Sequence, residues 1–202
     1  MDIETKYTLA LVHGILMVFV WIVAVPIAVA VPMYAKKKQK TWGAKVHMSI
    51  MATAAFLPFT ISAIMAFTAS GSLKLRPHST LGTIITFGAW IQMTLGIVNH
   101  SIFRYRRKHN CVPTTRPWNN SIHIWFGRIL MVAALVNIPL GMRIKKADTG
   151  YYVAYGVWLA MLIVMFTVLV LMKPENKQVA DGKDITMDDA ESDAEEVFDK
   201  KN

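Results

Sequence analysis

The sequence predicts an all-α integral membrane protein with five transmembrane helices. Hydrophobic residues make up 54% of the 202 residues, whereas charged residues make up only 17%. The charges are clustered, and the segments between them are long and uncharged: 7–35, 46–73, 77–103 and 149–172, together with 117–142, which contains one charge at Arg128. Each segment is long enough to cross a hydrocarbon core of ~30 Å, which takes about 20 helical residues.

The segments must be helices, because lipid cannot satisfy backbone polar groups and the segments are too long for the strands of a membrane barrel. The first segment is not a signal peptide, since it lacks a basic leader and a small-residue cleavage site. We expect helices near 7–34, 46–71, 78–104, 119–142 and 151–172, each bounded by the charged clusters, in one membrane domain over residues 1–172.

The last thirty residues differ in composition from the rest of the chain. Residues 173–202 hold 10 acidic and 5 basic residues and few apolar ones. Such a composition cannot bury enough apolar surface to fold. We therefore expect a disordered acidic cytoplasmic tail with no catalytic role.

Most of the remaining basic residues lie in the loops and indicate a topology. Ten lie in the loops after the first and third helices, and five lie in the alternate loops. Cytoplasmic loops carry the excess of Lys and Arg. We therefore expect the N-terminus to be extracellular or lumenal and the C-terminus cytoplasmic, in a plasma membrane or endomembrane. This pattern excludes a soluble enzyme and a nucleic-acid binder, and the single cysteine, Cys111, excludes a disulfide scaffold.

Histidines mark the candidate site. Of six histidines, five lie in the predicted helices, where ionisable residues usually face the bundle interior. Because helix direction alternates, His13 and His78 lie near the outer face and His47 and His123 near the cytoplasmic face. A porphyrin iron takes two imidazoles from opposite faces, and diagonal helices of a four-helix bundle can supply them. The first four helices are therefore predicted to form a di-haem four-helix bundle, although a single histidine could equally make a packing hydrogen bond.

Three glycines accompany these histidines. Gly82 and Gly127 follow His78 and His123 by four residues, on the same helix face, and Gly14 follows His13 directly. A glycine lets a flat macrocycle lie against the backbone. The alternative is that these glycines allow close helix packing, as is common in membranes.

Two further residues are candidates for haem contacts. His100 lies 22 residues after His78 and so returns to nearly the same helix face. It could replace a cytoplasmic ligand or bond a propionate. Arg128 is the one charge within a helix, and a haem propionate is a natural partner for a buried guanidinium. The alternative for Arg128 is that it extends to the membrane interface.

Several motifs in this order resemble the cytochrome b561 family, most closely the five-helix core of proteins that join a DOMON domain to a b561 domain. They are LVHG at 11–14, KVHM at 45–48, PHSTLG at 77–82, QMTLG at 92–96, WNNSIHIWFGR at 118–128 and NIPLG at 137–141. The resemblance covers residues 7–172.

The resemblance implies two b haems, with His13 and His78 holding the outer haem and His47 and His123 the cytoplasmic one. It also implies a transmembrane oxidoreductase that takes electrons from cytosolic ascorbate. The implied acceptors are monodehydroascorbate, a ferric chelate or the haem of a DOMON-type partner domain outside. We also expect the chain to contact membrane lipid and to pair with a second copy of itself as a homodimer.

Basic residues near each face are candidate docking sites for these anions, because a basic cleft attracts negative charge. The same residues would also set topology and contact anionic lipid. The cytoplasmic candidates are Lys36, Lys37, Lys40, Lys45, Arg104 and Arg106, and the outer candidates are Lys74, Arg76, Arg143, Lys145 and Lys146.

Two other functions fit the same pattern. A quinol-linked membrane cytochrome subunit would keep the haems but change the donor. A histidine-lined metal or proton transporter would hold no haem.

Overall fold

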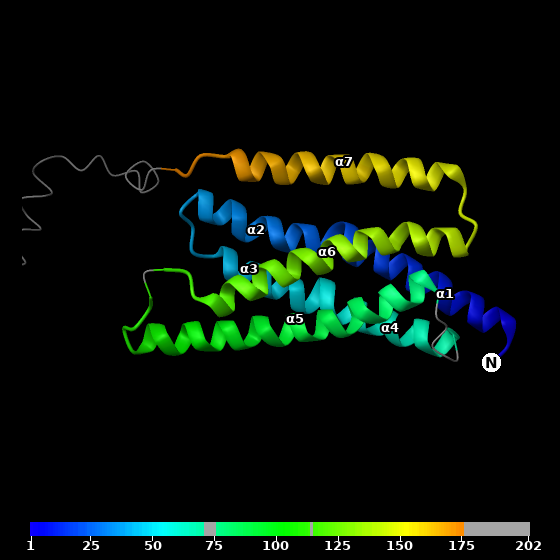
Figure 1. Cartoon of the computed structure of the whole chain (residues 1–202), viewed down its shortest axis with the longest axis horizontal. Helices are drawn as coiled ribbons and strands as arrows, with labels where there is room; N and C mark the ends of the chain where they lie inside the picture. Colours follow the sequence, from blue (N-terminus) through cyan, green and yellow to red (C-terminus); the bar gives the residue numbers. More distant parts are fainter. Residues whose placement is uncertain (71–75, 114, 176–202) are drawn as a thin grey trace, which may run out of the picture.

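The computed structural model describes residues 1–70, 76–113 and 115–175 of the chain. Of these residues 86% are helical and none lies in a strand. The helices form five segments that are long and apolar enough to cross a membrane, consistent with a multi-pass membrane protein (Figure 1). The candidate Lys74 and residues 176–202 of the predicted tail lie outside the described residues.

Each of the first two segments contains a short π-helix. The first comprises α1 (Ile3–Val18), η1 (Phe19–Ala24) and α2 (Val25–Lys37). The second comprises α3 (Gly43–Ile50), η2 (Met51–Phe56) and α4 (Leu57–Ser70). The π-helices end two residues before Pro26 and Pro58, where a wider turn relieves the clash of a proline ring with the carbonyl four residues earlier.

The remaining segments are single helices: α5 (Pro77–Lys108), α6 (Trp118–Ile144) and α7 (Thr149–Leu171). Helix α1 begins at Ile3, four residues before the expected start, because the Asp2 carboxylate accepts the Thr5 N–H at 2.7 Å and caps it. Asp148 caps α7 in the same way, through Gly150 N–H, and α7 begins two residues earlier than expected.

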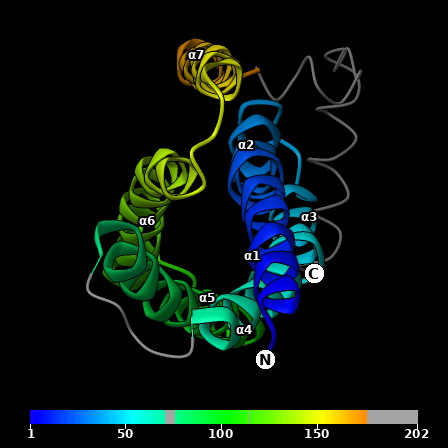
Figure 2. The same cartoon turned by 90° about the vertical axis from the view of Figure 1, so that its right-hand side faces the viewer.

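The helices pack as antiparallel pairs around one apolar core. Helix α1 lies along α4, α2 along α3, and α5 along α6, whereas α7 contacts mainly α2 at the edge of the molecule (Figure 2). The core lies at mid-span, where η1 meets η2 and α6, and its buried residues are Val20, Trp21, Ala24, Val25, Ala55, Phe59, Ile85 and Ala134. The candidate histidines therefore lie on either side of this core, nearer the two ends of the helices.

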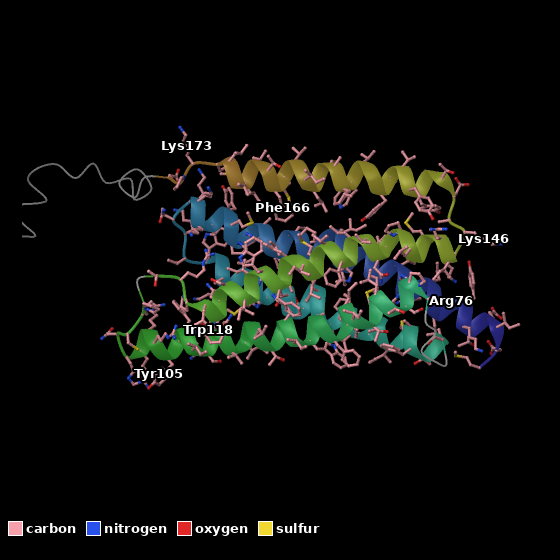
Figure 3. The ribbon with its side chains drawn as sticks, in the orientation of Figure 1. Arg76, Tyr105, Trp118, Lys146, Phe166 and Lys173 are labelled. Carbon is pink, nitrogen blue, oxygen red and sulfur yellow. The ribbon has the colours of Figure 1, made fainter. Side chains whose placement is uncertain are left out.

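The two ends carry different groups. Arg76 and Lys146 lie at the end where the chain starts, and Tyr105, Trp118 and Lys173 lie at the opposite end (Figure 3). Successive loops fall at opposite ends because successive helices run in opposite directions.

Prolines within the helices free carbonyls that side chains of other helices then use. A proline has no N–H to bond the carbonyl four residues earlier. Pro26 thus frees the carbonyl of Ile22, which accepts Trp158 Nε1–H at 3.1 Å, and Pro139 frees that of Leu135, which accepts the Tyr155 hydroxyl at 2.7 Å. Both donors belong to α7, so these two prolines create the attachment points of the fifth helix.

Candidate haem-ligating histidines

The structure brings His13 of α1 and His78 of α5 together at the end of the molecule where the chain starts. Their ring centroids are 6.3 Å apart, and the ring planes are inclined by 73°. Metal–imidazole bonds are about 2.0 Å long for zinc. Rings at this separation therefore leave room for one metal ion between their nitrogens.

The Nδ1 atom of His13 is held by α4. It donates to the Ser62 carbonyl at 3.0 Å, and the Ser62 hydroxyl lies 3.0 Å from the same nitrogen and donates to the His13 carbonyl at 3.1 Å. Ser62 is completely buried. This bonding turns Nε2, the other ring nitrogen, away from α4.

The ring of His78 is held by α6. Its Nδ1 donates to both the carbonyl and the side-chain Oδ1 of Asn137, each at 3.1 Å. The ring packs against Gly141, where an added Cβ would lie 2.8 Å from His78 Cε1. A glycine is therefore required at 141 for His78 to take this position.

His47 and His123 occupy the opposite end, near the starts of α3 and α6. The Nδ1 of His47 donates to the Ala28 carbonyl at 2.6 Å. This carbonyl is free because Pro32, four residues later, has no N–H. The ring of His123 packs on Gly96 of α5, where an added Cβ would lie 3.2 Å from His123 Cε1.

Three of the four rings thus donate Nδ1–H to a backbone carbonyl of another segment. A histidine that binds metal through Nε2 commonly makes this bond, because it fixes the tautomer and raises the basicity of the ligating nitrogen. A porphyrin supplies four ligands itself, so two histidines complete the coordination of its iron. Each end of the helices thus carries two histidines, the number that completes the coordination of one haem iron.

Sequence reasoning missed the residues that contact these histidines: Ala28, Ser62, Gln92, Gly96, Asn137 and Gly141. A signal for four of them was present. Helices α5 and α6 share one spacing, in which His is followed by Gly after four residues, an amide residue after ten more and a second Gly after four more: 78, 82, 92, 96 and 123, 127, 137, 141. Because the helices are antiparallel, each histidine meets the amide and second glycine of its partner.

The three predicted glycines have different surroundings. An added Cβ at Gly82 would lie 3.2 Å from Asn137 Nδ2, and one at Gly127 would lie 2.5 Å from Gln92 Nε2. Both glycines therefore admit an amide side chain of the neighbouring helix, as close helix packing requires. Gly14 has open space beside it, and its predicted contact with a macrocycle stays a prediction.

His100 and Arg128 take no part in the hydrogen bonds described above. His100 is half-buried on α5. Arg128 is exposed on α6, with its guanidinium 4.8 Å from the centre of the Trp125 ring. That stacking is compatible with a side chain extended towards the membrane interface, and the predicted propionate contact stays a prediction.

Among the basic candidates, Lys37 and Lys145 have defined partners. The ammonium of Lys37 donates to the Val170 and Met172 carbonyls at the end of α7, and Lys145 lies over the Tyr7 ring at 4.4 Å. A lysine at a helix C-terminus stabilises the unpaired carbonyls there. Of the other described candidates, Arg106 is half-buried and the remainder are exposed: Lys36, Lys40, Lys45, Arg76, Arg104, Arg143 and Lys146.

No family model, curated protein or solved structure matches this chain.

Proposed function

We propose that the chain is a transmembrane electron carrier of the cytochrome b561 type, in which the first four segments form a four-helix bundle around two b haems. His13 and His78 hold the outer haem, and His47 and His123 hold the cytoplasmic one. The observation that carries this proposal is the outer pair, whose rings come from different segments, have centroids 6.3 Å apart and each have Nδ1 bonded to a carbonyl.

Two histidines at each haem would leave its iron no open position, so the bound group would supply single-electron transfer and not oxygen activation. The chain's own residues determine how such a site behaves. Ser62, Asn137 and the Ala28 carbonyl keep the proton on Nδ1 of their histidine, which leaves Nε2 free to bind iron.

The apolar core between the two histidine pairs supports the same function. Trp21 and Phe59 pack edge to face there, with ring centroids 5.8 Å apart. A buried apolar layer keeps water and protons out of the space between the sites. Electrons can then cross the membrane without a parallel leak of ions.

The docking sites at the two faces follow from charge. Exposed Lys36, Lys40 and Arg104 would attract ascorbate, an anion, at the cytoplasmic face. Exposed Arg76 and Arg143 would do the same for monodehydroascorbate or a ferric chelate at the outer face, or would meet a DOMON-type haem domain. The enzyme activity proposed is therefore that of an ascorbate-dependent reductase.

A reduced-minus-oxidised visible spectrum of the purified protein tests this function. We expect the sharp α-band of a low-spin b haem after addition of dithionite, and a large fraction of it after addition of ascorbate alone. A protein with no such band is not a cytochrome, and the transporter alternative would then stand. A band that responds to a reduced quinol but not to ascorbate would favour the quinol-linked alternative.

A further inference from the structure

Two buried polar atoms on neighbouring residues of α5 and α6 have no partner in the described part of the chain. They are Nδ1 of His123, which can donate a hydrogen bond, and Oε1 of Gln92, which can only accept one. The two residues are already in contact, since Gln92 Nε2–H donates to the His123 carbonyl at 2.7 Å. Buried groups of this kind are almost always paired, so the complementary pair needs an explanation.

The other end of the same helix pair shows how such groups can be satisfied. Asn137 occupies the position on α6 that Gln92 occupies on α5, because both lie fourteen residues after their own helix's histidine. There the Asn137 side-chain oxygen accepts His78 Nδ1–H at 3.1 Å. His78 rests on Gly141 as His123 rests on Gly96.

We propose that Gln92 is a positioning residue for His123, and that its Oε1 accepts His123 Nδ1–H when His123 binds haem through Nε2. This inference rests on the proposed function. The Gln92 side chain already lies beside His123, since its Nε2 bonds the carbonyl of that residue, and reorientation of the amide would present Oε1 to Nδ1. The bond fixes the tautomer that frees Nε2 and makes that nitrogen a stronger ligand.

The two ends of the helix pair are not equivalent in this respect. His78 has a main-chain acceptor, the Asn137 carbonyl, in addition to the side-chain oxygen. The Nδ1 atom of His123 has no acceptor of either kind among the described residues, so Gln92 is the acceptor on which the orientation of the ring depends. Loss of the side-chain amide should therefore matter more at 92 than at 137.

The test uses the full-length, haem-loaded protein in detergent and compares Gln92→Leu, Gln92→Glu and Asn137→Leu. The readouts are the rate at which each haem transfers to apomyoglobin and the midpoint potential of each haem. In Gln92→Leu we expect one haem, the one that His47→Ala removes, to be lost roughly 10–100-fold faster, the usual effect of losing a residue that orients a metal-binding histidine.

Gln92→Glu separates this role from simple packing. The carboxylate keeps an acceptor for Nδ1–H but loses the donor to the His123 carbonyl. We expect it to hold the haem about as well as the parent, with a lower midpoint potential because a charged acceptor makes the imidazole a stronger electron donor to iron. We expect Asn137→Leu to weaken the other haem, and by a smaller factor.

Three results would overturn the inference. Haem loss from Gln92→Leu at the parent's rate would show that the amide does not position His123. Equal loss from Gln92→Leu and Gln92→Glu would show that the donor or the packing matters instead, as would loss of both haems together. A parent protein that binds no haem would overturn the proposed function itself.

Discussion

The ring of each candidate histidine is held by atoms of a different segment. Ser62, Ala28 and Asn137 each provide a carbonyl for an Nδ1 atom, and Gly96 and Gly141 provide the space in which a ring lies. The ligand set therefore depends on the register between neighbouring helices as much as on the histidines themselves. A shift of one residue would move the carbonyl out of reach.

Substitution of Gly141 tests this dependence at the outer site. An added Cβ would lie 2.8 Å from His78 Cε1, so Gly141→Val must displace the ring from its position. We expect the outer haem to be held at least about tenfold more weakly, in the range found when a residue that orients a metal-binding histidine is lost. Haem retention after gel filtration measures this.

Gly156→Val is the matched control for that experiment. Gly156 is exposed on α7 and has nothing within 4 Å of an added Cβ, so the same substitution should leave both haems in place. Equal retention by the two variants would mean that the His78 ring does not bind haem where it packs on Gly141.

The placement of His13 and His78 at one end of the molecule could be predicted from the sequence, whereas the main-chain atoms that bond the rings could not. Alternating helix direction is enough to assign His13 and His78 to one face. The bond from His13 to the Ser62 carbonyl involves a main-chain atom, so no residue type marks it in the sequence. Asn137 and Gln92 were marked by the repeated spacing, which becomes meaningful once α5 and α6 are known to be antiparallel neighbours.

At the scale of the helices, the prolines explain where free backbone carbonyls arise. Pro32 frees the Ala28 carbonyl for His47, while Pro26 and Pro139 free carbonyls for Trp158 and Tyr155 of α7. The sequence predicts only that prolines are tolerated in membrane helices. Which carbonyl each one frees follows from the sequence, but which side chain uses it depends on tertiary packing.

Pro32→Ala should therefore weaken one haem site, although it should stabilise α2 itself by restoring a backbone hydrogen bond. The new N–H at 32 would bond the Ala28 carbonyl and compete with His47 Nδ1. We expect haem held by His47 and His123 to be lost about tenfold faster. The rate of haem transfer to apomyoglobin measures it.

Pro26→Ala is the corresponding control. Its new N–H would compete with Trp158 Nε1–H of α7 for the Ile22 carbonyl. It should loosen α7, seen as faster proteolysis in the loop before α7, and leave both haems in place. Haem loss from Pro26→Ala at the rate of Pro32→Ala would show that the effect is general helix distortion.

The first turn of α1 should respond to pH through Asp2. The hydrogen bond from Thr5 N–H lowers the pKa of the Asp2 carboxyl. The unfolded turn then binds a proton more readily than the folded one, so the stabilisation is present above about pH 3.9, the ordinary pKa of Asp, and is lost as pH falls through the lower folded value.

Hydrogen exchange of the peptide that covers the first helical turn measures this loss. Asp2→Asn is the control, because asparagine caps the helix without titrating. We expect the exchange of the parent, relative to that of Asp2→Asn, to rise below about pH 3.9. A constant ratio across that range would contradict a capping role for the Asp2 carboxylate.

For the molecule as a whole, the chain's charge pattern predicts the direction of electron entry. The end with exposed Lys36, Lys40 and Arg104 carries the larger number of basic residues and is the predicted cytoplasmic face. We expect ascorbate to reduce the protein faster from this face in oriented proteoliposomes, as measured by stopped-flow spectroscopy.

Neutralising Lys36, Lys40 and Arg104 together should slow that reduction. Added salt should slow the parent more than the triple variant, because exposed charges are screened beyond ~8 Å at physiological ionic strength. Equal rates from both faces, or a triple variant as fast as the parent at low salt, would exclude docking at these residues without affecting the haem assignment.

The fold separates two histidine pairs by one apolar core, and the central claim is that each pair holds one haem. A pyridine haemochrome assay of the purified protein, with the chain concentration measured independently, tests this most directly. We predict two b haems per chain in the parent and one in each of His13→Ala, His78→Ala, His47→Ala and His123→Ala. A parent without haem would contradict the claim, and so would a full haem lost from His100→Ala but retained in His47→Ala, which would contradict the cytoplasmic pairing.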